Sequence, residues 1–446
     1  MFNRTSTQLH PWVVINANNK MIGRLSSLRF VLNEFNYPDK NLETTNDWTS
    51  KITNYSIEFE GIPFEDILAR ADFYKEDIYK FTRDLVRCPG GSGDESKAAK
   101  CTIDEMKKLG FNKIDIDPMG NILAYIGTGK HLVAMDGHLD VVGVGNIDNW
   151  DYDPYEGYED EEKIIGRGTT DMKGAIASIV YAAKIIIDLD IQDDFTLLVS
   201  ASVAEEDCDG LSWKYMIEEQ NIRPEFVLLA EPSDGKICRA QKGRMEISVD
   251  TFGTSAHGSI PHTGDNAIYK MSGILTELRA LNENLLVDDL LGKGCLTVSE
   301  IRSTAPSRCA VSDSCSISID RRLTWGEKPE DALQEIRNLP AIKMADAKVS
   351  IYHYDEPSYT GLEYGQECSF KPWKMEETHD VTQSVAKAYK ELFKKDAVID
   401  IWPFSTNGVS IMGEHNIPVI GYGPGELKFA HAPNEEVQKA DLILCA

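Results

Sequence analysis

The central part of the chain alternates between short apolar runs and longer segments with helical periodicity. Runs that are apolar at consecutive positions are typical of strands buried on both faces, and they read NILAYIG, HLVAMDG, FTLLVSASVA and FVLLAE. Apolar residues recur at helical spacing before and between these runs, in FEDILARADFYKEDIYKFTRDLVRC, ESKAAKCTIDEMKKLGF, MKGAIASIVYAAKIII and LSWKYMIEEQ. Strands of this kind separated by helices predict an α/β fold with a mainly parallel sheet.

The pattern changes after about residue 240 and changes back after about Met375. In between, RMEISVDTFGT and SCSISIDRRL alternate with period two, as half-buried strands do, and NAIYKMSGILTELRAL and PEDALQEIRNL are helical. The helix THDVTQSVAKAYKELF and the strand IPVIGYG then resume the α/β pattern. We therefore predict a small α+β domain inserted into an α/β domain. The predicted segments are an N-terminal extension of unknown role (1–68), two parts of the α/β domain (69–240 and 356–446) and the insertion (241–355).

Polar residues able to bind a metal follow the ends of the apolar runs. Because ligands bind at the carboxyl ends of strands in open α/β sheets, we expect these side chains to converge at one edge. They are His138 and Asp140 after HLVAMDG, Asp171 at the start of the next helix, Glu205 and Glu206 after FTLLVSASVA, Glu231 at the end of FVLLAE, and His431 after a Gly-Pro-Gly loop.

Such a cluster of carboxylates would repel itself, and divalent metal would remove the repulsion. Imidazole and carboxylate ligands together suit zinc, whereas ligands that are all oxygen suit magnesium or calcium. The set is large enough for two ions ~3.5–4 Å apart with one carboxylate bridging them. Each residue alone has an ordinary explanation: Asp171 could be a helix N-cap, and Glu205 with Glu206 a solvated helix start. The metal hypothesis depends on their convergence.

Composition narrows the function further. The net charge of −26 argues against nucleic-acid binding, which needs clustered lysine and arginine. No apolar run reaches the ~20 residues of a membrane helix, and the N-terminus shows no secretion signal. The nine cysteines include no C-x-x-C pair, so we predict neither a disulfide framework nor a thiolate zinc site. The cysteine pattern fits a reducing cytosol, so we predict a cytoplasmic protein, while the acidic balance says little about a small substrate.

Several ordered segments resemble the M20 family of metallopeptidases and deacylases. They are DGHLDVV, GRGTTDMKGAIAS, AEED, AEPSDGKI, GTSAHGSIPHTGDNAI, IDRRLTWGE and GYGPGELKFAHAPNEEV, and the resemblance covers about residue 68 to the end. The family includes acetylornithine deacetylase, succinyl-diaminopimelate desuccinylase and glutamate-releasing carboxypeptidases. GVGNIDNWDYDPYEG and PFSTNGVSIMGEHNIPVIGYGPGE are most similar to a branch called selenium metabolism-linked hydrolases. The resemblance implies a zinc-peptidase-like catalytic domain with an inserted lid and dimerisation domain.

The resemblance also implies a role for each residue of the cluster. His138 and Glu231 would bind the first ion, Glu206 and His431 the second, and Asp171 both. Glu205 resembles the general base, and Asp140 the residue that orients His138 through its other ring nitrogen.

Residues on the substrate side are implied in the same way. His257 resembles the lid histidine that reaches the substrate carbonyl, in this family often across a dimer interface, and Arg322 resembles an arginine that holds a substrate carboxylate. Asn407 stands where many members have Asp, and Cys309 and Ser312 stand where the family often has Asn and Pro, which leaves substrate identity open. A homodimer through the insertion is expected, with RMEISVD as a candidate edge strand.

We therefore predict a hydrolase that holds two zinc ions, or cobalt or manganese in their place, and cleaves an amide bond in a small N-acyl amino acid or dipeptide. An aminopeptidase on the same scaffold is one alternative. A catalytically inactive binding or scaffold protein is another, although no ligand is lost. A magnesium phosphohydrolase is disfavoured by His138 and His431 and by the lack of a G-x-x-x-x-G-K loop.

Overall fold

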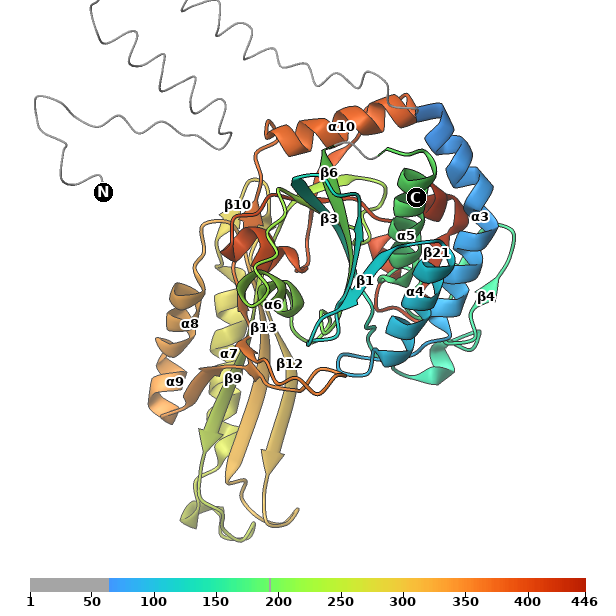
Figure 1. Ribbon diagram of the computed structural model, residues 1–446. Coiled ribbons are helices and arrows are strands. Elements are labelled where there is room, and N and C mark those ends of the chain that lie inside the picture. The colour runs from blue at the N-terminus through green and yellow to red at the C-terminus, as the bar shows by residue number, and fades with distance from the viewer. Residues whose placement is uncertain (1–63, 192–193) are drawn as a thin grey trace, which may run out of the picture. The chain divides into compact units, whose positions relative to one another are not determined.

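A computed structural model of the protein describes residues 64–191 and 194–446 (Figure 1). Most of the predicted N-terminal extension lies outside these residues. The first described helix, α3 (Phe64–Val86), already begins within the segment assigned to that extension. Within the described residues, no helix is long and apolar enough to cross a membrane.

A central sheet organises the larger part of the chain. Its strands follow the order β1-β2-β6-β3-β7-β20-β8-β18, and β19 also pairs with β8. The neighbours β6, β3, β7 and β20 are parallel to one another, which confirms the predicted mainly parallel sheet, while the pairs toward both edges are largely antiparallel. The strands are β1 (Lys113–Ile116), β2 (Ile122–Ile126), β3 (His131–His138), β6 (Phe195–Ser202), β7 (Val227–Leu229), β8 (Ile237–Gln241), β18 (Trp373–Lys374), β19 (Ile399–Trp402) and β20 (Val419–Gly421).

Both faces of this sheet are covered, as the apolar runs predicted. Along β6, Leu197 and Val199 pack into one core while the intervening Leu198 packs into another. The first core includes residues of α3, α4 (Ser96–Lys108) and α5 (Lys173–Asp188), and the second includes residues of α6 (Leu211–Glu218). Burial on both faces leaves the strand ends as the places where polar side chains can gather.

A second, antiparallel sheet is inserted between β8 and β18. It has the order β12-β13-β9-β14, and β17 also pairs with β9. One face packs its apolar residues against three helices, which confirms the inserted α+β part. The elements are β9 (Gly243–Phe252), α7 (Ala267–Glu283), β12 (Cys295–Thr304), β13 (Ser314–Leu323), α8 (Pro329–Arg337), α9 (Pro340–Ala345), β14 (Lys348–Ile351) and β17 (Ser369–Phe370). Because β17 follows residue 355, the inserted sheet extends beyond the predicted boundary.

The edge of this sheet is not the strand that the sequence predicted. RMEISVD lies in β9, which pairs with β13 on one side and with β14 and β17 on the other, so that prediction was wrong. Period-two alternation shows that a strand has one buried face, and it carries no information about neighbours. The edges are β12 on one side and β14 with β17 on the other, and β12, which pairs only with β13, is exposed on both faces over residues 300–304.

The last part of the chain returns to the central sheet and then forms a small sheet of its own. Helix α10 (Asp380–Phe393) precedes β19 and β20, and β21 (Glu436–Gln438) pairs with β5 (Lys163–Ile165), which pairs with β4 (Tyr158–Glu159). The short helix α11 (Lys439–Leu444) then packs against α3 and α5. The remaining short strands are β10 (Val287–Asp288), β11 (Gly292–Lys293), β15 (His353–Tyr354) and β16 (Gln366–Glu367).

Candidate metal centre

The four parallel strands bring the predicted ligands to one edge of the central sheet. In the register of β3 with β6, His138 lies opposite Ser202, and β7 ends opposite Asp136. The residues that follow β6 and β7 therefore leave the sheet beside His138. These residues carry Glu205, Glu206 and Glu231, while Asp171 comes from the loop before α5 and His431 from the loop after β20.

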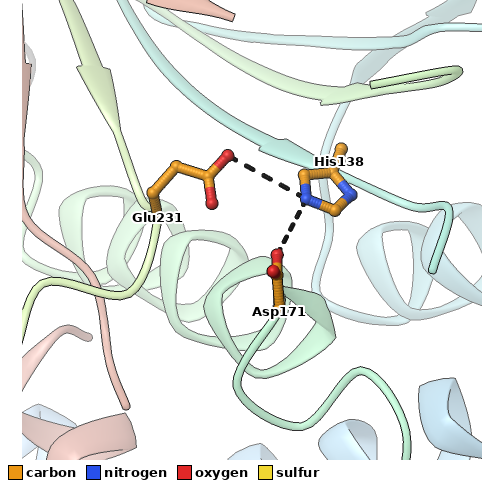
Figure 2. A group of neighbouring side chains, drawn as sticks. All are labelled: His138, Asp171 and Glu231. Atoms are coloured by element: carbon orange, nitrogen blue, oxygen red, sulfur yellow. Dashed lines mark hydrogen bonds and ion pairs between the residues drawn. The ribbon is translucent and has the colours of Figure 1, made fainter. Parts of the chain in front are cut away.

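One group of candidate ligands is buried at the end of β3 (Figure 2). The Nε2 atom of His138 lies 3.1 Å from Oδ1 of Asp171 and 3.9 Å from Oε1 of Glu231. Each side chain approaches from a different element, and Figure 2 shows both carboxylates directed at the same ring nitrogen. This is the ligand set predicted for the first ion.

A second group shares Asp171 with the first. The Nε2 atom of His431 lies 3.3 Å from Oδ2 of Asp171 and 3.0 Å from Oε2 of Glu206. One oxygen of Asp171 thus faces each group, as a bridging carboxylate requires. The structure brings together all five residues predicted as metal ligands.

The electrostatics of the two groups fit divalent cations. Burial and the charge of Asp171 raise the pKa of Glu206 to about 7, and hydrogen bonds to Asp171 and Glu206 raise the pKa of His431 to about 10. Both shifts reflect an excess of buried negative charge, which a divalent cation would offset. The buried Oε1 of Glu206 has no hydrogen-bond partner among the described residues and is available as a ligand atom. Ligands ~2.0–2.2 Å from one ion lie within roughly 4 Å of each other, and the ligand atoms of each group here lie within 4.8 Å of one another.

Glu205 lies beside the first group without belonging to it. Its Oε2 is 3.8 Å from Nε2 of His138, and its Oε1 is buried with no hydrogen-bond partner among the described residues. Burial raises the pKa of Glu205 well above its ordinary value. A carboxylate with a raised pKa and a free oxygen beside a metal group has the chemistry of a general base.

Asp140 contacts more of the centre than the sequence predicted. The nearest acceptor for Nδ1 of His138 is the main-chain oxygen of Asp140 at 2.9 Å, and a carboxylate oxygen lies 3.5 Å away. The carboxylate also accepts hydrogen bonds from the main-chain N–H groups of Glu205 (3.3 Å) and Glu206 (3.0 Å) and from the Ser92 hydroxyl (2.7 Å). Asp140 therefore orients the imidazole and also holds the turn that carries both glutamates.

Sequence reasoning missed a buried residue, Glu95, beneath the same turn. Its Oε1 accepts a hydrogen bond from the N–H of Ala204 at 2.9 Å, and Ala204 has a φ of 56°, a left-handed conformation that is uncommon for a residue with a side chain. Glu95 thus stabilises the backbone bend immediately before Glu205. An acidic residue at a helix start is common, so nothing in the sequence pattern marked this one.

Asn407 is placed differently from the prediction. Its side chain is 2 % exposed and donates to Asp136 (3.0 Å) and Ser202 (3.0 Å), while its oxygen accepts from the N–H of Gly210 (3.1 Å). All these partners belong to the protein interior below the strand ends. We predicted that Asn407 contacts the substrate, whereas the structure places its side chain in the interior, where it supports the strand ends beneath the metal centre.

The two lid residues lie apart from the metal groups in this chain. His257 follows β9, whose ten residues lead away from the central sheet over about 30 Å at ~3.4 Å per residue. Among the described residues, no hydrogen bond or ion pair links His257 or Arg322 to a metal-group side chain. Arg322 pairs with Asp320 through Nε at 2.7 Å and Nη2 at 2.9 Å. The predicted alternation is confirmed, because Arg321 lies on the opposite, buried face and pairs with Glu327.

Comparison with known proteins agrees with the resemblance to the M20 family. The family model described as peptidase family M20/M25/M40 matches residues 134–446. The uncharacterized protein YgeY of Escherichia coli K12 is 58% identical over 387 residues, which cover 87% of this chain and 96% of that protein. A probable succinyl-diaminopimelate desuccinylase of Staphylococcus aureus is 27% identical over 365 residues, covering 74% of this chain and 86% of the relative.

Solved structures share the fold. An M20 family metallo-carboxypeptidase from Sulfolobus solfataricus aligns with a TM-score of 0.67 at 16% identity, over 83% of this chain and 96% of that one. The narrower resemblance to selenium metabolism-linked hydrolases stays a prediction. From the family model, the metal ligands at the strand ends and the shared fold, we conclude that the chain belongs to peptidase family M20/M25/M40 and is a hydrolytic enzyme.

Proposed function

We propose that this enzyme holds two zinc ions and hydrolyses an amide or peptide bond in a small N-acyl amino acid or dipeptide. The observation that carries the proposal is the arrangement of Asp171, whose two carboxylate oxygens face separate histidine and glutamate groups. His138 and Glu231 would hold one ion, Glu206 and His431 the other. The mixed imidazole and carboxylate set favours zinc over magnesium or calcium.

When bound, the ions would polarise the scissile carbonyl and lower the pKa of the attacking water. The residues of the chain would carry the proton and the charge. Glu205 would accept the proton of the water and deliver it to the leaving nitrogen. His257 would donate a hydrogen bond to the carbonyl oxygen as negative charge develops there. In the tautomer with the proton on Nε2, Nδ1 accepts from the N–H of Ser259 at 3.2 Å and Nε2 is left to donate.

A combined metal analysis and substrate screen tests this function. The purified protein should contain two equivalents of a divalent ion per chain, removal by a chelator should abolish hydrolysis, and zinc should restore it. A panel of dipeptides, N-acyl amino acids and their amidated forms then separates a deacylase or carboxypeptidase from an aminopeptidase. A well-folded chain that binds no divalent ion would instead support the scaffold alternative.

Arg322 is our candidate for recognition of a free carboxylate in the substrate. It lies on the polar face of the inserted sheet, in register with Arg244 of β9. Nη1 of Arg244 donates to Asp209 at 2.9 Å, which places this end of the sheet against the loop that follows Glu206. Asp320 fixes the plane of the Arg322 guanidinium and leaves Nη1 for a substrate carboxylate.

We expect Arg322→Lys to raise KM for free-acid substrates about 10-fold or more with little change in kcat, because an ammonium cannot reproduce the planar guanidinium contact. Amidated substrates should be poor for the wild type and nearly unchanged in the variant. Steady-state kinetics on matched acid and amide substrates measure both effects. Arg223→Lys, at an exposed arginine whose side chain donates a hydrogen bond to Asn221, is the matched control. Equal turnover of acid and amide by the wild type would remove the role of Arg322.

We also propose a homodimer through the insertion, with β12 as the contact strand. The strand has an unpaired edge in the described chain, and Ile301 within it is 54% exposed. Long unprotected edges invite pairing with another chain, and two copies of one edge can pair antiparallel about a two-fold axis. Gly258 donates to the main-chain oxygen of Cys309 at 2.6 Å, so His257 lies at the tip of the insertion beside the loop that follows β12. His257 of the partner subunit would complete each centre.

Light scattering at micromolar concentration should give twice the chain mass for the wild type and the chain mass for Ile301→Lys, since the substitution places like charges along the shared edge. Met344→Lys, at an exposed apolar side chain of α9, should remain dimeric. A monomeric wild type would overturn this proposal.

Hybrid dimers test the shared centre directly. A subunit with His257→Ala and a subunit with Glu205→Gln, purified together through two different tags, should recover about half the wild-type rate, because one complete centre forms per dimer. Each parent dimer should be nearly inactive. No recovery in the hybrid would place His257 in its own subunit's centre, and an active His257→Ala parent dimer would place it outside catalysis. The domain boundaries and the cytosolic location stay predictions.

A further inference from the structure

A buried carboxylate that is not a ligand lies behind the metal centre. Glu435 is 0% exposed and lies in the loop between His431 and β21, directly before that strand. Neither the hydrolytic mechanism nor the ligand set uses it. Buried carboxylates are rare unless they are fully hydrogen-bonded, so its contacts show what it does.

Both oxygens of Glu435 are occupied by the loop that carries Asp171. Oε1 accepts hydrogen bonds from the main-chain N–H groups of Thr170 at 2.9 Å and Asp171 at 2.8 Å. Oε2 accepts from the N–H of Gly168 at 3.0 Å and from Nη1 of Arg167 at 2.6 Å. A carboxylate has about four acceptor positions, so this one is filled by four residues of a single loop.

The contacts run between two segments that supply ligands to the same ion. The main-chain N–H of Gly166 donates to the oxygen of Glu435 at 2.8 Å, and the Thr170 hydroxyl donates to the oxygen of Glu436 at 2.6 Å. These two hydrogen bonds connect the loop of Asp171 to the main chain of the segment after His431, in addition to the contacts of the Glu435 side chain. Glu206, the third residue of the second group, comes from a separate strand end.

We propose that Glu435 is a positioning residue that sets the distance between Asp171 and His431 and so controls the affinity of the second metal group. This inference rests on the proposed two-metal function. Glu435 touches neither ion nor substrate, and it acts through the backbone of the Asp171 loop. Residues that orient metal ligands typically change metal affinity by about 10–100-fold when they are replaced.

The Glu435→Gln variant tests the proposal through metal binding. The amide would turn an NH₂ group toward main-chain N–H donors, so the Asp171 loop must shift. Zinc titrations against a competing chelator should show the weaker of two sites losing about 10–100-fold in affinity, with a smaller change at the tighter one. Glu436→Gln is the matched control, because its side chain pairs with Lys163 at 2.6 Å and not with the loop.

Loss of the ion pair with Arg167 could by itself destabilise the fold, and a second variant separates the two effects. The double variant Arg167→Met with Glu435→Gln removes both charges. We expect its melting temperature to recover toward the wild type while the weaker zinc site stays impaired, because the glutamine NH₂ group still faces main-chain N–H donors. Recovery of zinc affinity in the double variant, or unchanged affinity in a folded Glu435→Gln protein, would overturn the proposal. A wild type that binds no zinc would instead refute the two-metal function.

Discussion

Glu205→Gln is expected to keep both metal ions and to lose about 10²- to 10⁴-fold in kcat, the usual contribution of a general base. Glutamine has nearly the same shape but cannot take a proton from water. Glu205 is not part of either ligand group, so the substitution should leave the metal content unchanged. Burial raises the pKa of Glu205 well above its ordinary value, which favours acceptance of a proton by this carboxylate.

Single-turnover kinetics together with metal analysis measure this prediction. Glu219→Gln, at the exposed end of α6, is the matched control and should behave as the wild type. A Glu205→Gln protein that has two ions and a near wild-type rate would remove the general-base role. A protein that has lost an ion would show that Glu205 supports a ligand instead.

Asp171→Ala should lose both ions together and its activity with them. The aspartate gives Oδ1 to the group of His138 and Oδ2 to the group of His431, so its removal leaves each group with two ligands. Two ligands do not hold a structural or catalytic zinc, which requires three or four from the protein. Metal content by mass spectrometry after gel filtration measures the loss.

Two further variants make this result specific. Asp171→Asn retains one oxygen, so it should keep at most one ion, and His431→Ala should empty the second group while the buried first group stays filled. Asp148→Ala, at an exposed aspartate, should keep both ions. If the Asp171→Ala protein still bound two equivalents of zinc, the bridging role would be wrong.

The metal ligands could be predicted from the sequence because the end of each apolar run marks the end of a buried strand. His138, Glu205 and Glu231 each follow an apolar run, and parallel neighbours bring such ends together whatever the strand order. The order β6-β3-β7-β20 itself is not encoded in any local pattern. His431 could be placed only through its motif, since it lies well beyond the end of β20.

The residues that support the ligands escaped prediction for a physical reason. In the sequence, Glu95 and Glu435 stand among other polar residues, so no pattern distinguishes them. Only the folded chain shows that main-chain N–H groups donate hydrogen bonds to their carboxylates. Asn407 was assigned to the substrate because of its motif, and its burial became evident only in the structure. The edge position of β12 depends on which strands pair, which alternation cannot report.

Because of the insertion, the ligands of the two metal groups are completed at different times during synthesis of the chain. His138, Asp171 and Glu231 are all made before the inserted sheet, whereas His431 is made after it. Residues 232–430 take roughly 10–40 s to synthesise at ~5–20 residues per second. In the two-metal proposal, the three ligands of the buried ion are therefore synthesised before the histidine of the outer ion, and the outer site cannot be completed until the insertion has been made.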